Sequence, residues 1–101
     1  MPLDVTGTGR VVVNGALTVD TVTLLASQTS RVLGAQSDGQ VEVDLGGVTH
    51  ADSAGLALLV SWLAHAQAAQ VRLAFRGVPD RLRAIARISE VEGLLTGAAP
   101  G

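Results

Sequence analysis

The sequence predicts an α/β fold, with a mixed sheet of four or five strands and helices packed on it. Short apolar segments rich in β-branched residues recur along the 101-residue chain, segments with apolar residues at helical spacing lie between them, and glycine or proline separates the two kinds. Their order, β-β-α-β-α-β-α, is typical of a sheet covered by helices. Residues 1–101 are therefore treated as a single domain, with a core over about 3–95 and a flexible tail over 96–101.

The first two elements are expected to form a hairpin at the edge of the sheet. Arg10–Asn14 is short and β-branched, and it follows the turn-rich sequence TGTG. A strand over Leu3–Thr6 would pair with it through a turn at Gly7 and Gly9.

A helix is predicted next, because apolar residues recur at helical spacing between Val22 and Leu33. Thr18 or Asp20 is placed to cap its start, since a side-chain oxygen there can accept a bond from an unpaired backbone N–H group. Gly34 is placed to end it.

The middle of the chain predicts a central strand followed by a long helix. Val41–Leu45 is too apolar for an edge strand, which needs charges or bulges to avoid pairing with other chains. The pair Gly46–Gly47 is expected to end it. A polar pair, Asp52 and Ser53, called the gate below, then precedes a helix that runs to about Ala69.

The last strand and helix follow at residues 71–75 and after Pro79. Pro79 suits the first turn of a helix, and Asp80 behind it suits the positive end of the helix dipole. Apolar residues are expected to face the core and arginines to face solvent, namely Leu82, Ile85 and Ala86 against Arg81, Arg83 and Arg87.

Composition limits the possible functions. The chain is 48% hydrophobic with only Trp62 and Phe75 as aromatic residues, which predicts an aliphatic core. Cysteine is absent, which excludes disulfides and thiolate metal or redox sites and fits a reducing compartment. The net charge is −2 and the seven basic residues are scattered arginines, so no dense basic stripe can neutralise phosphates. Nucleic acid is therefore not expected as a ligand.

The sequence also predicts a protein that does not enter the membrane itself. The N-terminal MPLDVTGTGR has no apolar stretch of the kind found in signal peptides. The longest apolar run, within Ala54–Val60, is too short to cross a bilayer. We expect a cytoplasmic location.

No catalytic or metal site is predicted. A phosphate-binding GxxxxGK[ST] motif is missing, so the chain is not expected to hydrolyse ATP. His50 and His65 have no third ligand at useful spacing. Ser53, Asp52 and His50 are too close in sequence to supply nucleophile, base and orienting group in line. We therefore expect neither enzyme activity nor a cofactor.

The helix behind the gate is apolar on nearly every side. One stripe belongs to the core at spacings of three and four residues: Leu56, Leu59, Val60 and Leu63. The other side would normally carry Lys or Glu in a monomer, but it holds Ala54, Ala57, Leu58, Ser61, Trp62 and His65. A helix of this kind is either deeply buried or covered by a partner. We expect a partner, with Trp62 as the interface anchor.

The gate has two interpretations. Ser or Asp at a helix start stabilises the helix by about 1 kcal/mol, because it satisfies free backbone N–H groups. The same position exposes the Ser53 hydroxyl, where a phosphate would also be favoured, or where a partner could make a small polar contact.

Three stretches of the chain resemble the STAS domain family. The central one is VEVDLGGVTHADSAGLALLVSWLAHA, in which a strand ending in Asp-Leu and a short loop precede Asp-Ser-Ala-Gly-Leu at a helix start. The similarity continues through GALTVDTVTLL upstream and FRGVPDRLRAIARISEVEGLL downstream, and so covers nearly the whole chain.

The resemblance implies a STAS fold and one of two functions. The details favour the MlaB-like subunit of a Mla-type phospholipid ABC transporter, which acts in outer-membrane lipid asymmetry in Gram-negative bacteria. Its partner is then the MlaF-like cytoplasmic ATPase, bound to a membrane permease, which places the chain at the inner membrane. The partner-binding residues are expected to be Asp52, Ser53, Ala54, Ala57, Leu58, Ser61, Trp62 and His65. The alternative is an anti-sigma factor antagonist regulated by phosphorylation of Ser53.

Overall fold

The computed structural model describes residues 3–88, which form a four-stranded sheet and four helices. In chain order the elements are β1 (Leu3–Gly7), β2 (Arg10–Leu17), α1 (Val22–Ala26), α2 (Thr29–Gly34), β3 (Gln40–Ala51), α3 (Ser53–Ala68), β4 (Arg72–Arg76) and α4 (Asp80–Ile88). The predicted α/β class is confirmed. The end of the predicted core, the predicted tail and any fifth strand after residue 88 lie outside the described residues.

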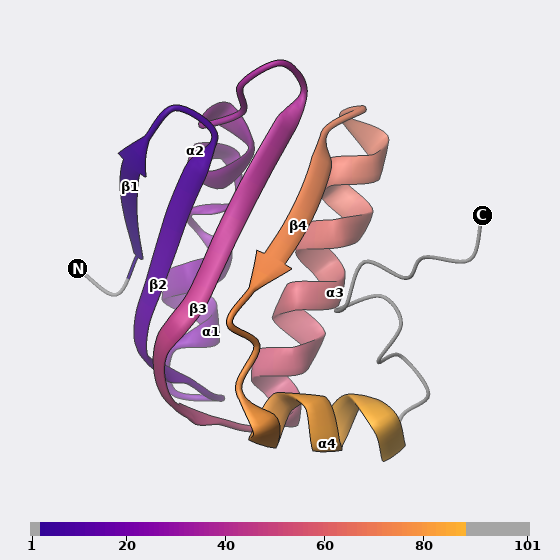
Figure 1. Ribbon diagram of the computed structural model, residues 1–101. Coiled ribbons are helices and arrows are strands. Elements are labelled where there is room, and N and C mark those ends of the chain that lie inside the picture. Colours follow the sequence, from indigo (N-terminus) through magenta and orange to yellow (C-terminus); the bar gives the residue numbers. More distant parts are fainter. Residues whose placement is uncertain (1–2, 89–101) are drawn as a thin grey trace.

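The sheet is mixed, with its strands in the order β1-β2-β3-β4 (Figure 1). β1 runs antiparallel to β2, whereas β2, β3 and β4 are parallel. Val11, Val43 and Phe75 are aligned across the three parallel strands. The prediction that Val41–Leu45 lies in a central strand is confirmed, because β3 pairs with β2 on one side and β4 on the other.

β3 is longer than predicted, because Gly46–Gly47 does not end it. The strand continues to Ala51, which pairs with Leu17 at the end of an equally extended β2. The register shifts twice along this second half. A Cβ atom on Gly47 would overlap the side-chain amide of Asn14. The glycine therefore allows a close approach between two strands rather than making a turn.

The single helix predicted between Val22 and Leu33 is two short helices, α1 and α2. Two hydroxyls at the junction bond to carbonyl groups in the preceding turn: Ser27 Oγ donates to Leu24 O at 2.5 Å, and Thr29 Oγ1 donates to Ala26 O at 2.7 Å. Such bonds compete with the helical ladder and bend or interrupt it. The predicted side-chain caps are also wrong, since the helix begins after Thr21 without a side-chain cap bond.

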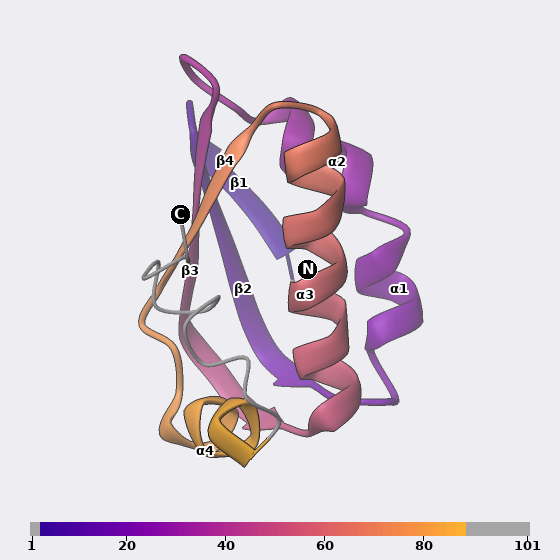
Figure 2. The ribbon, with the colours of Figure 1, turned by 90° about the vertical axis from the view of Figure 1, so that its right-hand side faces the viewer.

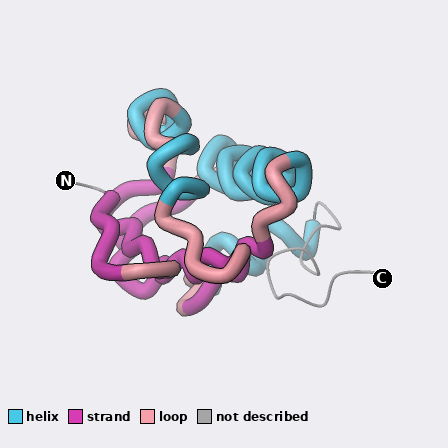
Figure 3. Tube along the Cα trace, turned by 90° about the horizontal axis from the view of Figure 1, so that it is seen from above, coloured by secondary structure: helices cyan, strands magenta, loops and turns pink. Residues whose placement is uncertain are grey.

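Three helices cover one face of the sheet. α1, α2 and α3 lie on the same side, and α4 lies across the end of the sheet where β2 and β3 finish (Figures 1 and 2). Seen from above, the helices on the face of the sheet lie in a layer of their own beside the strands (Figure 3). Within that layer α1 contacts α3. The core between the layers is aliphatic apart from Trp62. No helix within residues 3–88 combines the length and hydrophobicity that crossing a bilayer requires.

The other face of the sheet carries charged residues that alternate with the buried ones. Arg10 Nη2 lies 3.0 Å from Asp44 Oδ2, and Arg76 Nε lies 3.0 Å from Glu42 Oε1. The Gly46 backbone N–H group, which donates to Asp44 Oδ1, and then Arg10 hold the pKa of Asp44 below its usual value. These side chains make a solvated face, and each exposed pair contributes little stability.

Candidate functional site

The gate lies at the end of β3, and the Asp52 carboxylate joins two parts of the chain there. Asp52 Oδ1 accepts a hydrogen bond from the Gly55 backbone N–H group in the first turn of α3, at 3.0 Å. Asp52 Oδ2 accepts one from the Val19 backbone N–H group in the β2–α1 loop, also at 3.0 Å. The carboxylate therefore caps α3 and fastens the loop to its start.

These bonds also keep the carboxylate ionised. The pKa of Asp52 is lowered mainly by the Val19 N–H group, then by those of Gly55 and Ala54 and by the positive charge of Arg81. A carboxylate that accepts backbone N–H bonds at a helix start is stabilised in its charged form. The structure thus gives Asp52 the capping role that the sequence left open.

Gly55 has a structural role that the sequence reasoning missed. It is buried where α3 crosses the end of β2, and a Cβ atom there would overlap the Leu17 carbonyl oxygen and lie 2.8 Å from Leu17 Cγ. Only glycine lets the helix start approach β2 this closely. The glycine after Asp-Ser-Ala is the signal that could have revealed this contact.

Ser53 is exposed at the first position of α3. Its hydroxyl forms no hydrogen bond with any residue in the described range 3–88, whereas its neighbour Asp52 forms two. The half-buried Ala54 follows it. The two residues of the gate therefore differ in role. Asp52 stabilises the fold, whereas the Ser53 hydroxyl is accessible from solvent.

Along α3, an exposed face without charge leads away from the gate. The predicted residues Ala57, Ser61 and His65 are exposed there, together with Ala64 and Ala68. The His65 ring Nδ1–H group donates a hydrogen bond to the Ser61 carbonyl oxygen, at 2.8 Å. No Asp, Glu, Lys or Arg occurs in the 16 residues of α3. We call Ser53, Ala57, Ser61, Ala64, His65 and Ala68 the α3 face.

Two residues that the sequence analysis placed on this face are buried, and that placement was wrong. Trp62 is 0% exposed and Leu58 is 6% exposed. Trp62 Nε1 donates a hydrogen bond to Thr29 Oγ1 at 2.9 Å, which ties α3 to the start of α2. α1 and α2 cover this side of α3, so the helix has a second buried side besides the one facing the sheet. Of the predicted core stripe, Leu56 and Leu59 are buried as expected.

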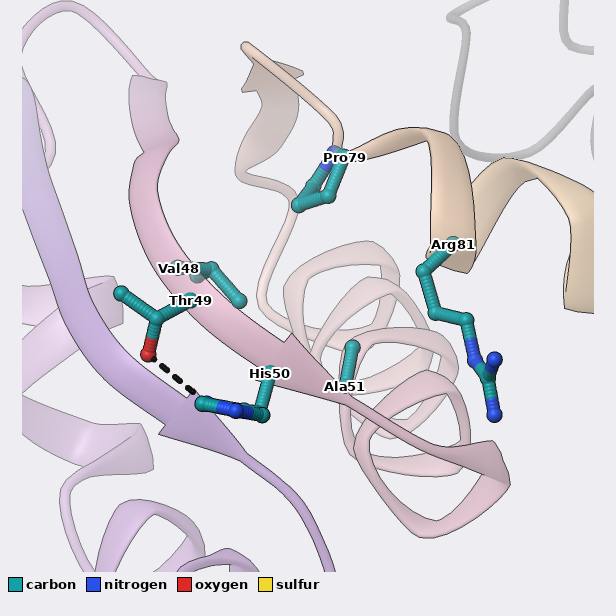
Figure 4. Close-up of a pocket in the computed structure, with 6 residues that line it drawn as sticks. All are labelled: Val48, Thr49, His50, Ala51, Pro79 and Arg81. Carbon is teal, nitrogen blue, oxygen red and sulfur yellow. Dashed lines mark hydrogen bonds between the residues drawn. The ribbon is translucent and has the colours of Figure 1, made fainter.

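A shallow pocket lies next to the gate, between the end of β3 and the start of α4 (Figure 4). It has a volume of about 380 Å³ and is lined by Val48, Thr49, His50, Ala51, Pro79 and Arg81. His50 Nδ1 lies 3.2 Å from Thr49 Oγ1. A larger open hollow of about 1010 Å³ follows β4 and contains none of the predicted site residues.

No group of three or more His, Cys, Asp or Glu side chains within residues 3–88 is arranged to hold a metal ion. The described site consists of an exposed hydroxyl at a helix start, small side chains along one helix face, and a carboxylate that accepts two backbone hydrogen bonds beside them.

The mixed sheet, the helices on one face and the Asp-Ser-Ala-Gly-Leu helix start define the class of protein as a STAS domain. The family described as "Mlab, STAS domain" matches residues 4–96, which is most of the chain. This chain belongs to that family. A comparison with curated protein sequences found no match.

Solved structures share the fold at low sequence identity. The anti-sigma factor antagonist SpoIIAA in its unphosphorylated form has a TM-score of 0.63 and 18% identity, over 85% of this chain and 80% of that one. A structure titled "Crystal Structure Analysis of Mglu" has a TM-score of 0.57 and 21% identity, over 78% of this chain but only 19% of that one. At these identities the similarity shows the fold alone.

Proposed function

We propose that this protein is a non-enzymatic subunit that binds and regulates the cytoplasmic ATPase of a Mla-type phospholipid ABC transporter. The family match over residues 4–96 supports this function. The observation that carries it is the uncharged α3 face, which begins at an exposed Ser53. Through the ATPase and its membrane permease, the protein would act at the inner membrane in outer-membrane lipid asymmetry.

The α3 face is suited to a protein partner for two physical reasons. Its alanine and serine side chains are small, so the backbone of a partner can approach α3 closely. It also lacks charged groups, whose desolvation would oppose docking. Asp52 directly precedes this face, but its carboxylate already accepts hydrogen bonds from two backbone N–H groups of the chain itself.

Two substitutions of Ser53 test the proposal against the purified MlaF-like ATPase. Ser53→Asp is expected to raise the dissociation constant about tenfold or more, because a neutral interface does not offset the desolvation of a carboxylate. Ser53→Thr keeps the hydroxyl and should bind like the wild type. Negative charge at a helix start does not destabilise α3, so lost binding would not reflect unfolding. Equal binding by wild type and Ser53→Asp would remove Ser53 from the interface.

The alternative function is an anti-sigma factor antagonist that is switched by phosphorylation of Ser53. The observation in its favour is the exposed Ser53 hydroxyl, which no described residue bonds, at a position where a phosphate is favoured. The similar fold of the antagonist SpoIIAA fits this function as well.

Affinity purification from the native host separates the two functions. Recovery of a transporter ATPase with the tagged wild type, lost on Ser53→Asp, supports the first. Recovery of an anti-sigma kinase that phosphorylates Ser53, and of no ATPase, supports the second and contradicts the first.

A further inference from the structure

Two large apolar side chains are exposed on the β2–α1 loop and on α1, the helix that contacts α3, and the sequence analysis did not include them. Val19, in the β2–α1 loop, is 66% exposed, and Leu24, on α1, is 51% exposed. α1 lies alongside α3 (Figure 2). The other exposed large hydrophobic residues within residues 3–88 are Val5 on β1 and Ile88 on α4. The helix layer near the gate therefore carries two of these four residues.

The loop that carries Val19 is fixed by hydrogen bonds. The Val19 backbone N–H group donates to Asp52 at the gate. Thr21 Oγ1 donates to the Ala16 carbonyl oxygen at 2.8 Å and accepts from the Thr18 backbone N–H group at 3.1 Å. A side chain exposed on a loop that is already ordered loses little conformational entropy when a partner binds it.

The charged residue next to Val19 in the β2–α1 loop is acidic. Asp20 is exposed there, whereas the Asp52 carboxylate that Val19 contacts also has the positive charge of Arg81 near it. All seven arginines lie on other elements: β2, α2, β4 and α4 carry Arg10, Arg31, Arg72, Arg76, Arg81, Arg83 and Arg87. The β2–α1 loop, α1 and α3 together contain no Arg and no Lys.

We propose that Val19 and Leu24 are the apolar anchors of the docking surface and that they insert into an aliphatic pocket of the ATPase, with Lys or Arg side chains on the edge of the pocket that faces Asp20. This inference rests on the proposed function and names the part of the partner that it requires. The small side chains of the α3 face allow the partner to approach closely. Val19 and Leu24 provide the apolar surface that the partner buries, a role that the sequence analysis gave to Trp62. The negative charge of Asp20 favours a basic protein surface and disfavours an anionic lipid surface.

Dissociation constants for the purified ATPase test the anchors. Val19→Ser and Leu24→Ser should each raise the constant about tenfold, the loss typical of an interface anchor. Val5→Ser is the matched control, because it makes the same change at an exposed valine on the edge strand β1. It should change the constant by no more than about twofold. All three variants should melt close to the wild type.

The dependence of binding on ionic strength tests whether the rim of the ATPase pocket is basic. Raising the ionic strength should weaken binding of the wild type, and Asp20→Asn should reduce that dependence. Binding that is insensitive to salt would contradict the basic rim.

The remaining outcomes separate this inference from the proposed function. If the wild type binds the ATPase and both serine variants bind equally well, the anchors are wrong and the function stands. If the wild type does not bind the ATPase at all, both are wrong. If the wild type forms a dimer in the absence of the ATPase, and Val19→Ser makes it monomeric, the occupant of this surface is a second copy of the chain. That result also overturns the inference.

Discussion

α3 and α4 differ in how clearly their sequences indicate which side of the helix is buried and which side faces solvent. α4 has nine residues, and its arginines lie in solvent while Leu82 and Ala86 are buried, as predicted. α3 has 16 residues and no charged side chain on any side. The comparison shows that charged residues, more than apolar ones, indicate which side of a helix faces water. Where charges are missing, either the helix has several buried sides or part of it meets a partner.

α3 has more than one buried side, and this explains the error at Trp62. The side facing the sheet and the side facing α1 and α2 are buried, and only the α3 face remains exposed. A tryptophan that anchors an interface and one that fills a core have the same sequence signature, because both are large and both need a partner for the indole N–H group. The acceptor proved to be Thr29, which is 33 residues away in the sequence.

The largest expected effect on stability is at Trp62. Trp62→Ala should lower the free energy of unfolding by about 3–5 kcal/mol, because it leaves a cavity among α1, α2 and α3. Trp62→Phe should cost less, since it keeps most of the volume but leaves Thr29 without its indole donor. Urea unfolding measures both. A Trp62→Ala variant as stable as the wild type would mean that this side of α3 is not a core.

Gly55 gives the next largest effect. Gly55→Ala should destabilise the protein by about 1–3 kcal/mol, because the added methyl group meets Leu17 at the end of β2. The matched control is Gly34→Ala in α2, where no atom lies within 4 Å of the added Cβ and φ is not positive. That change should be neutral or stabilising by up to about 1 kcal/mol. Equal melting temperatures for the two variants would contradict the close contact of α3 with β2.

A smaller effect, dependent on pH, is expected at Asp52. Its pKa in the folded protein lies below the value of about 3.9 in an unfolded chain. The ionised carboxylate therefore contributes stability above about pH 4, and this contribution is lost as the pH falls through the lowered pKa. Asp52→Asn should be less stable than the wild type at neutral pH and should approach it in acid. Asp44 titrates in both proteins, so its contribution cancels.

The melting temperatures of the wild type and Asp52→Asn, followed from pH 7 downward, measure this difference. A gap that stays constant into acid would show that the carboxylate charge does not stabilise the cap.

Much of the fold could be predicted from the sequence because local patterns determine it. Alternating apolar residues marked β3 as a strand, and Asp52 marked the start of α3 correctly. The errors arose where distant residues decide the outcome. Asn14 packs against Gly47, where β3 continues instead of ending. The hydroxyls of Ser27 and Thr29 bond to backbone carbonyl groups where the predicted first helix is interrupted. Neither contact has a periodic signal.

The candidate site was predicted in part for the same reason. The exposure of Ala57, Ser61 and His65 agrees with the predicted outward face, because a helical repeat places them together. Val19 was missed, since its position beside the gate depends on the bond from its backbone N–H group to Asp52 across 33 residues. Whether these residues bind a partner stays a prediction.

One pair of substitutions tests the central claim, that the α3 face and not α4 docks on the ATPase. Ala57 on α3 and Ala84 on α4 are both exposed alanines within a helix. Ala57→Arg and Ala84→Arg should each change stability by no more than about 0.5 kcal/mol. Isothermal titration of each variant into the purified ATPase should show binding weakened at least about tenfold by Ala57→Arg and nearly unchanged by Ala84→Arg. Equal affinities for the two variants, with both folded, would contradict the claim.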